Sequence, residues 1–87
     1  MFVILTYDVR VRRLARARKT VRKYLRPVQR SVFEGFLSEG KLKRLREELR
    51  KCLDCGEDSV RIYTFQTLQG ARVDELGVSA GSDEIVL

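Results

Sequence analysis

Apolar residues along this chain alternate between the spacing of a strand and that of a helix, and few folds accommodate such an order. Residues 2–6 are all apolar or β-branched, which predicts a buried strand. Residues 11–25 predict a helix whose apolar stripe consists of Leu14, Ala17, Val21, Tyr24 and Leu25. Pro27 is expected to end this helix within about one residue, because the residue before a proline avoids the helical region.

The middle of the chain repeats this alternation. Residues 28–37 predict extended structure, with Gly35 marking a bulge or tight bend, and the sequence leaves open whether they form one bent strand or two. Ser38 is expected to cap a second helix, whose stripe consists of Leu42, Leu45, Leu49, Cys52 and Leu53. Residues 54–58 predict a turn, and residues 59–68 an alternating strand.

The C-terminal part changes character. Residues 69–83 contain three glycines and three acids and predict a loose linker, while residues 85–87 form a short apolar strand that needs a sheet edge. The order β-α-β(β)-α-β is typical of the ferredoxin-like sandwich, an α+β fold. We therefore expect a ferredoxin-like βαββαβ domain over residues 1–78, with residues 79–87 as a tail that adds an extra C-terminal strand.

Length and composition limit the class of protein. A domain of 87 residues buries only about 60–65% of its unfolded surface, so we expect a thin core and an oligomer that buries a further apolar face. The chain is 34% charged and 44% hydrophobic, which is typical of a globular protein. No apolar run reaches the ~18 residues of a membrane span and nothing resembles a cleaved signal, so we expect a cytoplasmic protein with no membrane partner.

The distribution of charge points to a polyanionic partner. The formal net charge is +6, and residues 9–33 contain ten Lys or Arg and no acid. Five of these cations fall in one narrow arc of the first predicted helix: Arg12, Arg16, Lys19, Lys23 and Arg26. Like charges at helical spacing repel by some tenths of a kcal/mol per pair, and a phosphate backbone would offset that repulsion. We expect RNA or DNA as the partner.

Asp8 is the candidate for catalysis. It follows the first strand, where the buried sheet meets solvent, and we expect it to be half desolvated and able to bind a cation. A strand-end aspartate that only starts a turn or caps a helix is the alternative. The chain has no histidine, which removes the commonest general base and zinc ligand, so hydrolysis would depend on carboxylates with a hard cation.

Three blocks of residues resemble a known family. They are residues 7–9 (Tyr-Asp-Val), residues 28–35 (Val-Gln-Arg-Ser-Val-Phe-Glu-Gly) and residues 57–63 (Glu-Asp-Ser-Val-Arg-Ile-Tyr), together with the arginine-rich first helix. Over about residues 1–68 the chain resembles the small CRISPR-associated adaptation proteins, the "Cas-two" family, which are the smaller of the two core spacer-acquisition proteins.

The resemblance implies a ferredoxin-like homodimer with metal-dependent phosphodiesterase activity on RNA or DNA. It also implies a scaffold that bridges copies of the CRISPR integrase subunit, with C-terminal strands that pair across the dimer. Asp8 would bind Mg²⁺, shared between two copies across the two-fold axis, and a metal-bound water would attack phosphorus slowly. The predicted nucleic-acid contacts are Arg12, Arg16, Lys19, Lys23 and Arg30, and the predicted supporting residues are Tyr7, Ser31 and Phe33.

Several alternatives stay open at this stage. Tyr7 is favoured as a core residue, whereas Phe33 fits a dimer core as well as it fits the site. Cys52 and Cys55 form a CxxC motif at a helix end, with Cys52 expected in the core and a disulfide left open. A toxin-type mRNA interferase of a related ferredoxin-like family, or a non-catalytic RNA- or DNA-binding module, would show similar patterns.

Overall fold

The computed structural model describes residues 1–67 and 70–77, so the predicted strand at residues 85–87 and the tail at residues 79–87 lie outside the described part. The elements are β1 (Phe2–Asp8), α1 (Val11–Arg22), β2 (Arg26–Gln29), β3 (Val32–Phe36), α2 (Glu39–Cys52), β4 (Ser59–Thr67) and β5 (Gly70–Gly77). The first six follow the ferredoxin-like order, which confirms the predicted α+β fold, and β5 is an additional strand.

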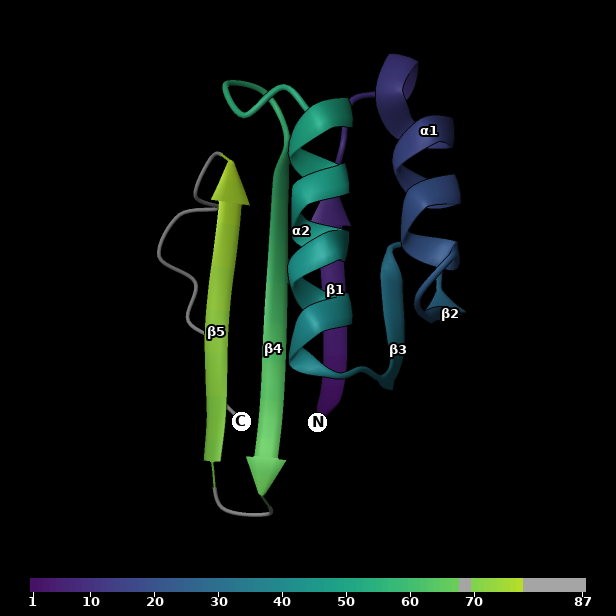
Figure 1. Ribbon diagram of the computed structural model, residues 1–87. Coiled ribbons are helices and arrows are strands. Elements are labelled where there is room, and N and C mark those ends of the chain that lie inside the picture. Colours follow the sequence, from purple (N-terminus) through teal and green to yellow (C-terminus); the bar gives the residue numbers. More distant parts are fainter. Residues whose placement is uncertain (68–69, 78–87) are drawn as a thin grey trace.

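The molecule has two layers (Figure 1). Five strands form one antiparallel sheet in the order β2-β3-β1-β4-β5, and both helices pack against the same face of that sheet. The N-terminal strand β1 is therefore the central strand. Neither helix within residues 1–67 and 70–77 has the length and apolar composition to cross a membrane.

The core lies between the sheet and the helices. Alternate residues of β1, namely Val3, Leu5 and Tyr7, are buried beneath the helices. In register, Leu5 lies between Phe33 of β3 and Ile62 of β4, all three fully buried. Burying an aliphatic or phenyl side chain of this size contributes about 1.5–3 kcal/mol, so this central row is a main source of stability. The helices contribute Ala17 and Val21 from α1, and Leu42, Leu45 and Leu49 from α2.

The first helix is shorter than predicted. It ends at Arg22 instead of residue 25, and the N–H groups of Tyr24 and Leu25 both donate to the carbonyl of Val21 in a closing turn. The reason is that Pro27 lies inside β2, so the chain must already be extended at Arg26, the residue before it. Leu25 is nevertheless buried, as its place on the apolar stripe indicated.

Residues 28–37 contribute to two strands, which answers the question that the sequence left open. β2 and β3 form a hairpin whose turn lies at Arg30 and Ser31. Pro27 has no N–H to donate, and β2 is an edge strand of the sheet, where a proline is tolerated.

The predicted loose linker over residues 69–83 is wrong for residues 70–77, which form β5 along β4. Acids in this stretch suggested solvent, but two of them have cationic partners on other elements: Asp74 pairs with Arg46 of α2 at 3.1 Å, and Glu75 pairs with Arg61 of β4. Gly77 ends the strand at φ 92°, and a Cβ there would lie 1.9 Å from the carbonyl oxygen of Asp58. Glycine at this position therefore permits close backbone contact between β5 and the start of β4.

Candidate nucleic-acid and metal site

Asp8 is the last residue of β1 and is exposed, not half desolvated as predicted. The register explains the difference. Pairing of β1 with β3 stops at Thr6, so Asp8 has a strand neighbour only on the β4 side, where it lies opposite Ser59. Strand alternation places Asp8 on the sheet face opposite to that of Tyr7, away from the helices.

Within the part of the chain that the structure describes, the Asp8 carboxylate has no hydrogen bond or ion pair, and no group of three or more potential ligands surrounds it. A free, exposed carboxylate fits Mg²⁺, which keeps several waters and binds proteins through one or two carboxylates. Among the described residues, Asp8 is not part of a cluster of ligands that could enclose a metal ion. Asp8 is therefore suited to holding a hydrated cation that a phosphate also contacts.

The turn that carries Asp8 into α1 is held by a residue that the sequence prediction missed. Asp58 is fully buried, and its carboxylate accepts hydrogen bonds from the backbone N–H of Arg10 at 2.9 Å and that of Asp54 at 2.9 Å. The Nε of Arg13 donates to it at 2.6 Å. One buried carboxylate thus joins the β1–α1 junction, the first turn of α1 and the α2–β4 loop.

These contacts explain the electrostatics of the junction. The Arg13 guanidinium, followed by the N–H groups of Arg10 and Asp54, holds the pKa of the Asp58 carboxyl well below its usual range despite burial. The hydrogen bond with the Asp58 carboxylate, and then the one with Glu57, raises the pKa of Arg13. Asp58 also compensates for a missing cap, because Arg10 at the N-cap of α1 has no side-chain cap of its own. Periodicity gave no signal for this role, although Asp58 lies in the block of residues 57–63 that carries the family resemblance.

Three of the five cations in the predicted basic arc have acidic partners. Arg12 pairs with Glu57 at 2.9 Å, Lys23 pairs with Glu48, and Arg26 pairs with Glu34 at 2.8 Å. For these three cations, acids within the chain offset part of the repulsion for which the sequence suggested a phosphate backbone. Arg16 and Lys19 have no ion pair among the described residues.

The predicted supporting residues divide between core and turn. Tyr7 and Phe33 are core residues whose ring centroids lie 5.5 Å apart, so Phe33 belongs to the core of the single chain and not to a dimer core. The Tyr7 hydroxyl is buried and has no hydrogen-bond partner in the described structure. The carbonyl of Ser31 accepts a bond from the Tyr7 N–H at 3.2 Å, which places the β2–β3 turn beside the end of β1. Arg30 is exposed on that turn.

The cysteine motif is unbridged. Cys52 and Cys55 are both free, with Cys52 buried in the core as predicted and Cys55 exposed. The Sγ of Cys52 lies 3.9 Å from the hydroxyl oxygen of Thr20, so the residue links the two helices by packing.

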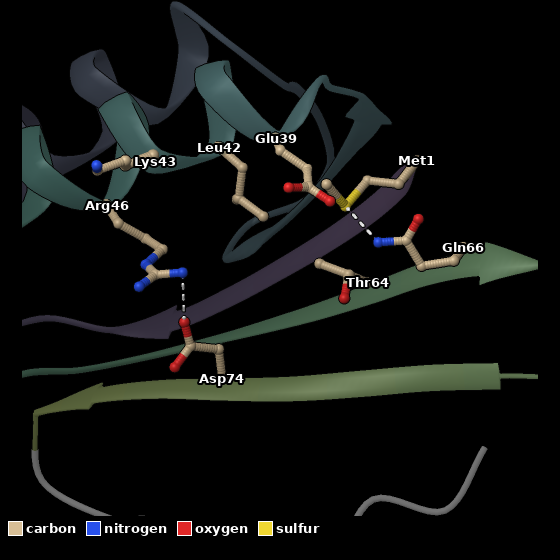
Figure 2. Close-up of a pocket in the computed structure, with 8 residues that line it drawn as sticks. All are labelled: Met1, Glu39, Leu42, Lys43, Arg46, Thr64, Gln66 and Asp74. Atoms are coloured by element: carbon tan, nitrogen blue, oxygen red, sulfur yellow. Dashed lines mark hydrogen bonds and ion pairs between the residues drawn. The ribbon is translucent and has the colours of Figure 1, made fainter.

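A polar cavity of about 460 Å³ lies elsewhere, between α2 and strands β4 and β5 (Figure 2). Arg46 points across it to Asp74, and Gln66 donates to the sulfur of Met1. Met1 precedes β1 and Asp8 ends it, so the Met1 end of this cavity and the candidate metal carboxylate lie at opposite ends of the central strand.

Comparison with known proteins identifies the family. The family model described as "CRISPR associated protein Cas2" matches residues 1–73. The chain belongs to the Cas2 family. The CRISPR-associated endoribonuclease Cas2 of Thermotoga maritima is 43% identical over 86 residues, covering 99% of both chains. The protein of the same name from Frankia alni is 44% identical over 87 residues and the full length of both.

Solved structures of Cas2 proteins have the same fold. A crystal structure titled as Cas2 matches with a TM-score of 0.74 at 36% identity, covering 100% of this chain and 98% of that one. Cas2 of Streptococcus pyogenes at pH 6.5 matches with a TM-score of 0.69 at 31% identity, covering 75% of this chain and 86% of that one. The resemblance predicted from three short blocks of sequence is thereby confirmed.

Proposed function

We propose that this Cas2 family member is a homodimeric nucleic-acid-binding protein that cleaves phosphodiester bonds in RNA or DNA, with Mg²⁺ held by Asp8. The relatives from Thermotoga maritima and Frankia alni are named endoribonucleases, which supports nuclease activity. The observation that carries the proposal is that Asp8 is an exposed carboxylate without a partner among the described residues, at the end of the central strand.

The homodimer is supported by the sheet face opposite the helices. This face presents Phe2 and Phe36, whose ring centroids lie 5.1 Å apart, and Phe36 is 78% exposed. An exposed aromatic patch of this kind is typical of an interaction surface. Asp8 belongs to the same face, so a two-fold axis through this face would place both Asp8 residues on the interface side.

The proposal assigns separate roles to the carboxylate at the end of β1 and to exposed cations of α1. Asp8 would hold the cation, and exposed Arg16 and Lys19 would bind the phosphate backbone of the substrate without reading its bases. When bound, Mg²⁺ would supply a polarised phosphate and an acidified water. The chain has no histidine to act as a general base near neutral pH, so we expect slow turnover.

A structural task accompanies the cleavage. We propose that the dimer also holds duplex DNA during CRISPR adaptation and bridges copies of the integrase subunit, in the cytoplasm where these nucleic acids are found. Membership of the Cas2 family and the concentration of cations on α1 support this role. It requires phosphate binding but not Asp8, so the two tasks are separable by mutation.

The test is Asp8→Asn, compared with Glu47→Gln as a matched control that removes another exposed carboxylate from the outer side of α2. Cleavage of labelled RNA and DNA is measured with Mg²⁺ and with EDTA, and Mg²⁺ binding is measured by calorimetry. Asp8→Asn should lose metal-dependent cleavage and metal binding, whereas Glu47→Gln should retain both. Without Mg²⁺, the thermal midpoint of Asp8→Asn should stay the same or rise, because the substitution removes the repulsion between the Asp8 carboxylates of the two protomers in the proposed dimer. Full cleavage by Asp8→Asn would overturn the catalytic assignment.

A further inference from the structure

A groove of about 340 Å³ lies between α1 and α2, and cations from both helices line it. Both helices cover the same face of the sheet (Figure 1). Arg16 and Lys19 come from α1, and Lys51 comes from the last turn of α2. All three are exposed. The contacts predicted from the sequence include no residue of α2, whose charges are of mixed sign.

The acid in this groove is already engaged. Glu48 pairs with Lys23 and also accepts a hydrogen bond from the Tyr24 hydroxyl on its other oxygen. Lys23, and then Tyr24, lower the pKa of Glu48, so it stays ionised and neutralises Lys23. Among the described residues, Arg16, Lys19 and Lys51 have no ion pair of their own. The groove therefore carries three positive charges that have no ion pair among the described residues.

The floor of the groove offers no alternative partner for these charges. The Thr20 hydroxyl donates to the backbone carbonyl of Arg16 at 3.0 Å, and Cys52 is buried. Within the described residues, Arg16, Lys19 and Lys51 have no ion pair that an incoming anion would have to displace. A groove with low-dielectric walls also strengthens the field of one-signed charges along its rim.

We propose that this groove binds the phosphodiester backbone of a nucleic-acid duplex through Arg16, Lys19 and Lys51. The proposal rests on the proposed nucleic-acid binding and deepens it, because it selects the contacts and adds one from α2. Arg16 and Lys19 are three residues apart, which is about 4.5 Å along α1 at 1.5 Å per residue, and phosphates of one strand recur about every 3.4 Å along a duplex axis. The two cations of α1 are therefore spaced to contact neighbouring phosphates, and dimerisation through the opposite face leaves them accessible.

The test measures the affinity of the full chain for DNA duplexes of two unrelated sequences by fluorescence anisotropy at several KCl concentrations. Lys51→Ala and Arg16→Ala should each weaken binding similarly for both sequences and lower the slope of log K against log[salt] by about one. Arg50→Ala is the matched control: it removes an exposed cation next to Lys51 on the opposite flank of the same helix and should leave the slope unchanged.

The outcomes separate the two proposals. If the wild-type chain binds duplex with a clear salt dependence but Lys51→Ala behaves like Arg50→Ala, the groove is not the binding surface and only this inference fails. A loss confined to one of the two duplex sequences would also overturn it, because backbone contacts carry no sequence information. If the wild-type chain binds no duplex at all, the proposed nucleic-acid binding fails as well. Equal thermal midpoints of the three variants confirm that folding is not the cause.

Discussion

Asp58→Asn should destabilise the fold far more than a single neutralised charge normally does. The Asp58 carboxylate accepts hydrogen bonds from four N–H groups, the backbone groups of Arg10 and Asp54 and two on the Arg13 guanidinium. An asparagine keeps one acceptor oxygen and presents an NH₂ group to the other donors, so about half of the bonds are lost. The side chain is fully buried, and water cannot replace them.

The magnitude follows from these contacts. Leaving a buried donor without an acceptor costs about 1–3 kcal/mol, and breaking a buried ion pair costs about 3–5 kcal/mol. Arg13 keeps Glu57 as a partner at 2.7 Å and is 19% exposed, which reduces the loss. We expect about 3 kcal/mol at pH 7, or a fall of about 12–24 °C in the thermal midpoint of a domain of this size.

The matched control is Glu57→Gln. Glu57 is the neighbouring residue and pairs with the same Arg13, but its side chain is 40% exposed, so we expect a loss below about 1 kcal/mol. Urea denaturation of each variant at one fixed protein concentration measures the free energy of unfolding, since a dimer's stability depends on concentration. Asp58→Asn within 1 kcal/mol of the wild type would refute the assigned role of Asp58.

Acid provides a second readout of the same contact. The folded-state pKa of Asp58 is lowered, so its contribution to stability is present above the unfolded pKa of about 3.9 and is lost as the pH falls below that value. The stability difference between wild type and Asp58→Asn should therefore be constant from pH 7 to about pH 5 and shrink on further acidification. A difference that persists unchanged at pH 2–3 would show that the loss comes from shape and not from charge.

Two further predictions concern the sheet. Phe36→Asp should turn the homodimer into monomers in sedimentation at micromolar concentration, because it places a charge in the exposed aromatic patch; an unchanged dimer would remove this face from the interface. Gly77→Ala should cost more than about 2 kcal/mol and speed hydrogen exchange in β5, since a Cβ meets the carbonyl oxygen of Asp58 and φ is positive. Gly40→Ala in α2, with nothing within 4 Å, should be neutral or slightly stabilising, and equal effects of the two substitutions would contradict the steric argument.

Periodicity predicted the elements that bury a regular stripe. The stripe from Leu42 to Cys52 appears in the structure as a buried row, because burial itself imposes that period. The first strand was predicted from its continuous apolar run, and the structure buries its alternate residues Val3, Leu5 and Tyr7. β5 was missed because its glycines and acids resemble those of a loop. It pairs with β4, and its acids pair with Arg46 and Arg61, which lie on other elements and are invisible in a local window.

The candidate site was predicted only in part for the same reason. Asp8 could be found, because a carboxylate at the end of an apolar run is a local signal, but its exposure depends on where β3 stops pairing. Asp58 could not be singled out, because its importance comes from Arg10 and Arg13, forty-eight and forty-five residues away in sequence. Residues that act by joining distant segments leave no periodic trace.

Contacts between distant segments also change the number of cations on α1 that are free to bind phosphates. Counted from the sequence, the arc offers five phosphate contacts per chain, which corresponds to a salt slope of about −4.5. In the structure Arg12, Lys23 and Arg26 are neutralised by acids from other elements, while Lys51 joins Arg16 and Lys19. Three contacts correspond to a slope of about −2.7 per chain. The two slopes are far enough apart to be distinguished in one salt titration. Such a titration therefore measures how many of these cations bind phosphates and how many are held by acids within the chain.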